Sequence, residues 1–212
     1  MMTDNIGLMH FVVGPVSTNC YIVYNRQTLE AFVVDPGANA SGLAAKLEEK
    51  NLKPVAILLT HGHFDHAGAA EELAGKYDIP IYAHEAEAET LNNPSINLSG
   101  NMMGQPARYE VDNFLRDEET IKLAGFDIRV LFTPGHTPGG CCYYLPYEDL
   151  LFSGDTLFCG SVGRTDFPGG SMSQLVGAVR DKLMVLPDNT VVLTGHDSDT
   201  TIERERLYNP YL

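Results

Sequence analysis

Residues 60–66 read Thr60-His61-Gly62-His63-Phe64-Asp65-His66, which places four potential metal ligands within six residues. A buried histidine or aspartate that lacks a partner costs folding free energy, so a fold clusters four of them only where a cation or a dense hydrogen-bond network compensates. The stretch therefore predicts a metal site rather than a polar surface loop.

The segments on either side of this stretch place it between a strand and a helix. Residues 55–59 form a continuous apolar run after Pro54, which is typical of a strand buried on both faces. Residues 66–77 are rich in good helix formers and predict a helix. Side chains at i and i+2 of an extended chain point the same way, so His61 and His63 should meet at one point. Asp65 and His66, where the chain turns, should point elsewhere and could hold a second ion.

Four further apolar runs also end in a residue that can bind a metal. These are 31–34 before Asp35, 126–132 before His136 in Thr133-Pro134-Gly135-His136, 150–152 before Asp155, and 191–193 before His196. In α/β sheets, ligands collect beyond the carboxyl ends of strands, where glycine permits tight turns. We therefore expect the five strand ends to build one composite site.

The candidate ligands divide into two sets. The three-histidine set is His61, His63 and His136. The second set combines a carboxylate with two histidines: Asp65, His66 and His196. Asp155 is available to bridge the two sets. Imidazole and carboxylate without thiolate suit Zn²⁺, Fe or Mn²⁺, whereas a structural zinc site is normally closed by cysteines. We therefore expect a catalytic site with two divalent ions, Zn²⁺ before Fe or Mn²⁺.

The order of these motifs resembles the metallo-β-lactamase superfamily and, within it, the glyoxalase II (hydroxyacylglutathione hydrolase) branch, in a short form without the C-terminal helical domain. The resemblance implies a four-layer αβ/βα sandwich, whereas periodicity alone supports only α/β or α+β. It also assigns the two ligand sets to metals 1 and 2, makes Asp155 the bridge, and makes Asp35 a support for the ligands. The catalytic residues it implies are Asp65, His61, His136 and Asp155.

The activity implied is hydrolysis of a small anionic thioester of the acylglutathione type. Two divalent ions about 3.5–4 Å apart can share a water, lower its pKa to about 7 and present a bridging hydroxide to the thioester carbonyl. Arg164, in Gly163-Arg164-Thr165-Asp166-Phe167, either offers a charged fork to the substrate carboxylate or pairs with Asp166. Without the C-terminal domain, only Arg204 and Arg206 could add cationic contacts to glutathione.

Two other functions fit parts of the sequence. The Gly163–Phe167 loop also resembles that of persulfide dioxygenases, in which one iron would be held by His61, His136 and Asp155. A non-catalytic, metal-stabilised binding protein is the third interpretation, although such a scaffold would be free to lose ligands and this chain retains all of them.

Composition limits the kinds of binding partner and the cellular compartment that we expect. The chain has 28 Asp and Glu against 14 Lys and Arg, for a formal net charge of −14. This disfavours nucleic acid, because affinity there comes mainly from phosphate neutralisation. The first residues lack a basic n-region and no apolar run approaches 18 residues, so we expect a cytoplasmic protein without membrane partners.

Cysteine spacing and chain length complete the expectations. Cys20, Cys141, Cys142 and Cys159 form no CxxC pair, so we expect reduced thiols. Cys159 lies four residues beyond Asp155 and could line the active site, but we favour a place in the core, where free cysteine is more common. A single domain over residues 1–212 is expected from the length and the 44% hydrophobic content. His84 follows a predicted strand and is a candidate for a supporting or substrate-side role.

The remaining pattern predicts the following elements. Strands are expected at 6–13, 20–24, 79–83, 119–123, 126–132, 141–145, 149–153 and 190–194, helices at 41–51, 85–91, 171–186 and 199–207, and a loop at 92–108.

Overall fold

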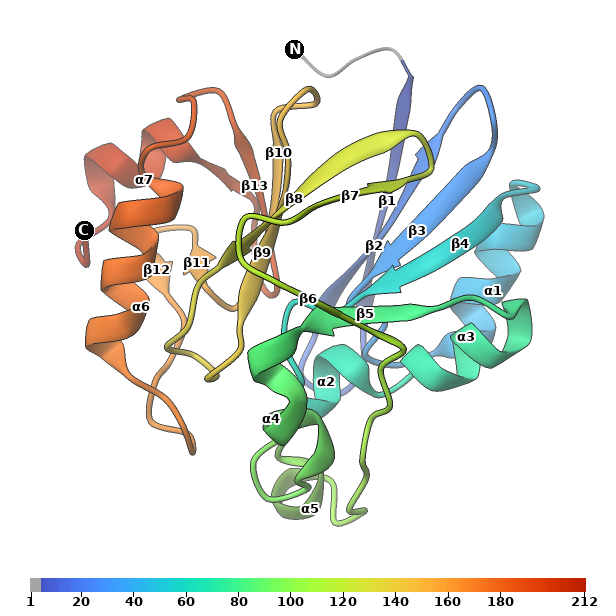
Figure 1. Ribbon diagram of the computed structural model, residues 1–212, viewed down its shortest axis with the longest axis horizontal. Coiled ribbons are helices and arrows are strands. Elements are labelled where there is room, and N and C mark those ends of the chain that lie inside the picture. The colour runs from blue at the N-terminus through green and yellow to red at the C-terminus, as the bar shows by residue number, and fades with distance from the viewer. Residues whose placement is uncertain (1–4) are drawn as a thin grey trace.

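The computed structural model describes residues 5–212 as two facing sheets with helices on their outer sides (Figure 1). The first six-stranded sheet has the order β1 (Ile6–Val13), β2 (Thr18–Asn25), β3 (Glu30–Val34), β4 (Lys53–Leu58), β5 (Ile81–His84) and β6 (Asn113–Leu115). The second has the order β14 (Thr200–Thr201), β13 (Val191–Thr194), β10 (Leu150–Gly154), β9 (Cys141–Leu145), β8 (Phe126–Phe132) and β7 (Thr120–Leu123). A separate hairpin joins β11 (Leu157–Phe158) to β12 (Ser161–Val162).

The helices fall into two outer groups and one group at the edge of the sheets. Helices α1 (Ala40–Glu49) and α3 (Ala70–Tyr77) flank the first sheet, and α6 (Met172–Ala178) and α7 (Ile202–Tyr208) flank the second (Figure 1). Helices α2 (Phe64–Ala67), α4 (Ala88–Asn92) and α5 (Ser99–Met102) lie toward one end. This is the αβ/βα sandwich of the metallo-β-lactamase fold, as expected. No helix within residues 5–212 is long and apolar enough to cross a membrane.

The central strands β3 and β10 read as continuous apolar runs because both of their faces are buried. Phe32 and Val34 of β3 point into the layer between the sheets, where Phe32 packs edge-on against Phe152 of β10. Their neighbours Ala31 and Val33 point the other way, into the layer beneath α1 and α3. Alternate residues of one strand therefore serve two different cores.

A third apolar layer lies on the outer face of the second sheet. Leu151 of β10 and Val192 of β13 pack there with Leu175 of α6 and Ile202 of α7. Strands β3, β4 and β5 run parallel, as do β10 and β13, so each group has its carboxyl ends at one edge. The predicted ligand residues follow these ends, except His136, which follows β8.

The predicted helix 66–77 is wrong as one continuous element. It is divided into α2 and α3, with the break at Gly68 and Ala69. The chain turns there because Ala69 N donates to Pro36 O (2.9 Å), and a Cβ on Gly68 would lie only 2.5 Å from Gly37 O. Contact with the loop after β3 therefore overrides the helix propensity of the segment.

Other differences concern short elements. The predicted loop 92–108 contains α5, the predicted helix 171–186 is α6 followed by a π-helical turn over Val179–Leu183, and the predicted helix 85–91 is a 3-10 turn over Glu85–Glu87 followed by α4. Strands β6, β11, β12 and β14 were not predicted, because segments of two or three residues carry too little periodicity.

Candidate metal centre

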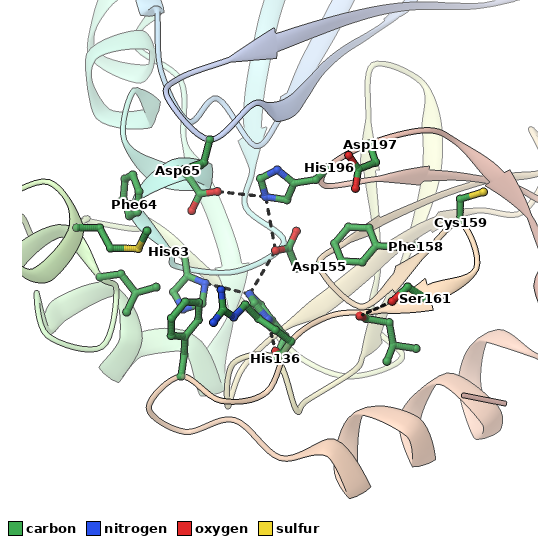
Figure 2. Close-up of a pocket in the computed structure, with 16 residues that line it drawn as sticks. His63, Phe64, Asp65, His136, Asp155, Phe158, Cys159, Ser161, His196 and Asp197 are labelled. Atoms are coloured by element: carbon green, nitrogen blue, oxygen red, sulfur yellow. Dashed lines mark hydrogen bonds and ion pairs between the residues drawn. The ribbon is translucent and has the colours of Figure 1, made fainter. Parts of the chain in front are cut away.

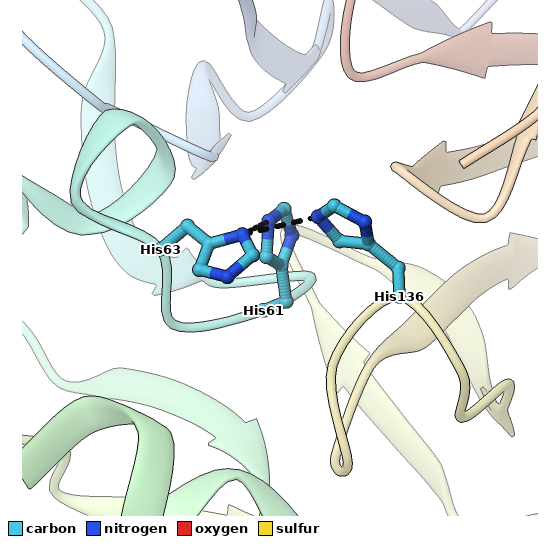
Figure 3. A group of neighbouring side chains, drawn as sticks. All are labelled: His61, His63 and His136. Carbon is cyan, nitrogen blue, oxygen red and sulfur yellow. Dashed lines mark hydrogen bonds between the residues drawn. The ribbon is translucent and has the colours of Figure 1, made fainter. Parts of the chain in front are cut away.

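Three histidines meet at the edge of the sheets. His61 and His63 come from the loop between β4 and α2, and His136 comes from the loop between β8 and β9 (Figure 3). His63 Nδ1 lies 3.1 Å from His61 Nε2 and 3.0 Å from His136 Nε2. All three side chains are buried. Three ring nitrogens therefore converge on one point, as the i, i+2 spacing of His61 and His63 predicts.

The surroundings keep His61 and His63 neutral. Burial lowers the pKa of His61 well below its usual range, and the neighbouring His66 adds to the effect. Burial, followed by the proximity of His136, lowers the pKa of His63 to about 3. A neutral imidazole with a free lone pair is the form that binds a metal ion.

The second set lies beside the first and is charged. Asp65 Oδ2 is 3.4 Å from His66 Nε2 and 3.3 Å from His196 Nε2. Burial alone would lower the pKa of His66, but Asp65, Asp35 and Asp155 together raise it well above its usual range. Burial would raise the pKa of Asp65, yet His66, His196 and Thr18 lower it.

Asp155 lies between the two sets, as expected (Figure 2). Its Oδ2 is 3.4 Å from His136 Nε2 and 3.6 Å from His196 Nε2, while its Oδ1 is 3.4 Å from His66 Nε2. Burial would raise its pKa, but His66 and the other histidines lower it to about 2. The carboxylate is therefore ionised and within reach of both sets.

Unsatisfied atoms show that this cluster fits a cation. Within residues 5–212, the buried atoms His66 Nε2 and Asp155 Oδ1, which face one another in the cluster, have no hydrogen-bond partner. Two tetrahedral ligands about 2.0–2.1 Å from one ion lie about 3.4 Å apart, which matches the distance between these two atoms. The donor set and its spacing are those of a site for divalent metal ions.

Asp35 supports this cluster from behind. Its Oδ1 accepts a hydrogen bond from Thr60 N (2.8 Å), and its Oδ2 accepts one from Thr60 Oγ1 (2.7 Å) and lies 2.9 Å from His66 Nδ1. The carboxylate thus orients the His66 ring and leaves Nε2 directed at Asp65 and Asp155. Such contacts fix ring orientation and raise ligand basicity in metal sites.

Three supporting contacts escaped the sequence analysis. His136 Nδ1 lies 2.7 Å from the carbonyl of Arg164, so it carries the proton there and leaves Nε2 free. Thr18 Oγ1 donates to Asp65 Oδ2 (2.9 Å). Glu87 bonds to both ligand loops of the three-histidine set. A main-chain carbonyl leaves no sequence signal, and Glu87 lies in a run of alternating Glu and Ala that reads as an exposed helix.

A pocket of about 410 Å³ opens onto the centre (Figure 2). Its walls outside the ligand sets are largely apolar, with Val16, Phe64, Leu98, Met102, Phe158, Val162 and Phe167. Cys159 lines the pocket and is exposed, so its expected place in the core is wrong. The cause is the β11–β12 hairpin, which turns the chain outward at Cys159.

The arginines considered from sequence lie in different places. Arg164 lines the pocket, but it makes two 2.7 Å bonds to Asp166 and stacks on Phe167. Arg204 bonds to Glu205 outside the pocket lining, and Arg206 holds the carbonyls of Met184 and Leu186. The last two therefore serve structural contacts.

The wall of the pocket at the β11–β12 hairpin is held by the last helix. Glu205 of α7 accepts a hydrogen bond from Gly160 N (2.8 Å), and Asn209 Nδ2 donates to Ser161 O (3.0 Å). His84 lies elsewhere, stacked on Phe132 with its Nδ1 accepting from Ala86 N, and it does not line the pocket.

Comparison with known proteins agrees with this geometry. The model of the metallo-β-lactamase superfamily matches residues 13–196. The chain is 39% identical to the probable metallo-hydrolase YqgX of Bacillus subtilis, over 94% of each chain. It is 36% identical to the hydroxyacylglutathione hydrolase GloC of Haemophilus influenzae, over 96% of this chain and 98% of that one.

Solved structures extend the comparison. The BLEG-1 B3 metallo-β-lactamase superposes with a TM-score of 0.92 at 40% identity, over 97% of this chain and 99% of that one. TTHA1623 in a di-iron-bound form gives 0.83 at 35% identity, covering 96% and 100%. ETHE1 from Myxococcus xanthus gives 0.78 at 27% identity, covering 96% and 83%. The chain therefore belongs to the metallo-β-lactamase superfamily, a family that includes metal-dependent hydrolases.

Proposed function

We propose that this protein is a dinuclear metal-dependent hydrolase of thioesters, of the hydroxyacylglutathione hydrolase type. The observation that carries the proposal is the position of Asp155, whose two oxygens lie 3.4–3.6 Å from ligand atoms of both sets. A single-ion site would not need Asp65, His66 and His196 gathered on the far side of that carboxylate.

Two bound divalent ions would supply an activated hydroxide nucleophile and polarise the substrate carbonyl. His61, His63 and His136 would hold the first ion, Asp65, His66 and His196 the second, and Asp155 both. Zn²⁺ suits this nitrogen and oxygen set, and Fe or Mn²⁺ also fits.

The protein's own groups then orient the reactants. Asp65 lines the pocket and is fixed by Thr18 Oγ1, so its carboxylate can accept a hydrogen bond from the attacking hydroxide and orient that hydroxide toward the carbonyl. The thioester would lie against Phe158 and Phe167 on the pocket walls. The sulfur of a thioester is a good leaving group, so no protein nucleophile is required.

The thiol part of the proposed substrate is glutathione. GloC, at 36% identity, is named for acylglutathione hydrolysis, which supports a glutathione thioester. Among the described residues that line the pocket, Arg164 is the only lysine or arginine, and it is already bonded to Asp166. Recognition of a glutathione carboxylate by this residue would have to share or displace that pair.

A mononuclear iron persulfide dioxygenase is the second candidate. His61, His136 and Asp155 also lie together, and the similarity to the ETHE1 structure covers 96% of the chain. The complete second set favours the hydrolase.

The test combines metal analysis with three assays. Protein purified without added metal is analysed for elements, then tested for hydrolysis of S-D-lactoylglutathione and for oxygen consumption with glutathione persulfide. Close to two ions per chain with thioester turnover supports the proposal, whereas one iron with oxygen consumption replaces it with the dioxygenase. A chromogenic cephalosporin assayed in parallel tests the activity named for BLEG-1.

A further inference from the structure

Glu87 is a buried carboxyl group outside the two ligand sets. It lies in the 3-10 turn Glu85–Glu87 that follows β5, and its side chain is fully buried. Within residues 5–212, none of the ion pairs found involves Glu87. A buried acid without a cationic partner is costly unless its oxygens are well hydrogen-bonded. Its contacts therefore indicate what the acid does.

Each oxygen of Glu87 serves a different ligand loop. Oε1 accepts a hydrogen bond from Gly62 N (2.9 Å), and Gly62 lies between His61 and His63. Oε2 accepts one from Thr137 Oγ1 (3.0 Å), directly after His136. The backbone N–H of Gly139 also donates to the carboxyl group. One carboxylate thus joins the two loops that supply the three-histidine set.

Close backbone packing reinforces this arrangement. A Cβ on Gly139 would lie 2.2 Å from Glu87 N and 2.4 Å from Glu87 Oε2, so only glycine lets the His136 loop approach the turn. On the other side, a Cβ on Gly62 would lie 3.0 Å from the side chain of Leu91, in the helix α4 that follows the turn. The turn and α4 together therefore pack closely against both ligand loops.

We propose that Glu87 is a positioning residue that sets the separation between His136 and the His61–His63 pair, and thereby the affinity and geometry of the first metal site. The proposal rests on the metal centre of the proposed function but not on which reaction it performs. Gln at position 87 keeps the size of the side chain but has one acceptor oxygen in place of two. Its amide group would therefore face an N–H donor on one of the loops, and the two loops would move apart.

The test measures metal binding without substrate. Metal-free protein is titrated with Co²⁺ against a competing chelator, in a His196→Ala background that weakens the second set, and the d–d absorption of bound Co²⁺ reports ligand number and geometry. Glu87→Gln should lower the Co²⁺ affinity by about 10–100-fold, the usual range for losing a support of a metal ligand, and should change the absorption spectrum. Thr137→Val, which removes one donor, should show a smaller loss in the same direction.

Glu205→Gln provides the matched control. Glu205 is also fully buried, and it likewise accepts from a backbone N–H of a loop, at Gly160, and from a threonine hydroxyl, at Thr200; unlike Glu87, it also pairs with Arg204. Glu205→Gln should lower the thermal unfolding midpoint, as Glu87→Gln should, yet leave the Co²⁺ affinity and the absorption spectrum unchanged.

Three results would overturn the proposal. These are wild-type Co²⁺ affinity and spectrum in Glu87→Gln, an equal loss of affinity in Glu205→Gln, or, should Glu87→Gln not fold, wild-type binding in Thr137→Val. Because no substrate is used, each result is separate from the outcome of the thioesterase assay.

Discussion

The two halves of the centre use the same residue type in opposite electrostatic states. In the three-histidine set the pKa values of His61 and His63 are lowered, chiefly by burial. In the second set the pKa values of His66 and His196 are raised against the burial effect by carboxylates, with Asp65 contributing to both. The first set is therefore organised by the geometry of neutral rings, whereas the second is organised by charge.

Their supports also differ. The first set is held by the carbonyl of Arg164 and by the buried carboxyl group of Glu87, which bonds to both ligand loops. The second is held by Asp35 and Thr18, and both sets line the pocket, the first through His63 and His136 and the second through Asp65 and His196. We infer that the first set, whose three histidines are all buried, anchors its ion more firmly than the second set, in which Asp65 and His196 are partly exposed.

The largest effect should come from removing the group common to both halves. Asp155→Ala should lower thioester turnover by about 10³-fold or more, the scale of a major electrostatic contribution, and should reduce metal content. His61→Ala should behave similarly. Turnover and elemental analysis check both variants, with Asp199→Ala, a carboxylate outside the pocket lining, as the control that keeps its metal. Wild-type turnover in Asp155→Ala would refute the two-metal model.

Removing one ligand from each set in turn should show that the two sets differ in how firmly they retain metal. His196→Ala should retain close to one ion per chain, because the three-histidine set is intact, while thioester turnover falls by about 10²–10³-fold, since a catalytic ion contributes several kcal/mol. His63→Ala should disturb the first set and lose more metal. If both variants bound the same amount of metal, the proposed difference between the sets would be wrong.

A pH experiment should isolate the contribution of the buried Glu87 carboxyl group to the free energy of unfolding. Burial raises the pKa of Glu87 to about 7, partly offset by its bonds to Gly62, Thr137 and Gly139. The folded state then binds the Glu87 proton more tightly than the unfolded state, in which the glutamate pKa is about 4.3. The stability that this protonated Glu87 contributes is therefore lost as pH rises from about 4.5 to about 7. The unfolding free energy of metal-free wild type should fall relative to Glu87→Gln across this window, by about 3 kcal/mol at most. Urea unfolding of both proteins measures the difference, and a constant difference would contradict the shift.

The smallest effect is expected at the open side of the pocket. Arg164 is exposed and bonded to Asp166, and exposed pairs contribute about 0.2–1 kcal/mol. Arg164→Ala should therefore raise KM for S-D-lactoylglutathione by about fivefold at most, with kcat little changed. Asp166→Asn frees the guanidinium and should lower KM if the substrate carboxylate binds there. A much larger effect of Arg164→Ala, seen with the glutathione thioester and not with an uncharged one, would make Arg164 the main recognition group.

The ligand sets could be predicted because each residue follows an apolar run long enough to mark a buried strand. His61, His136 and His196 follow β4, β8 and β13 in this way, and parallel strand ends meet at one edge. The role of Glu87 could not, since only the folded chain brings its turn against residues 62, 137 and 139. The exposure of Cys159 also depends on a hairpin whose strands are two residues long. Sequence patterns thus predict layers and strand ends, while contacts between loops require the fold.

The hydrogen bonds from the α7 segment to the β11–β12 hairpin hold a wall of the pocket that is distinct from the metal-binding residues. Glu205 and Asn209 fix the wall that carries Cys159 and Ser161, yet they bond to no residue of either ligand set. Substitutions in this last helix can therefore reshape the substrate-facing wall across a lineage while the metal-binding machinery stays intact. Substrate preference could in this way change through substitutions in α7 while each successive variant kept its metal-binding residues.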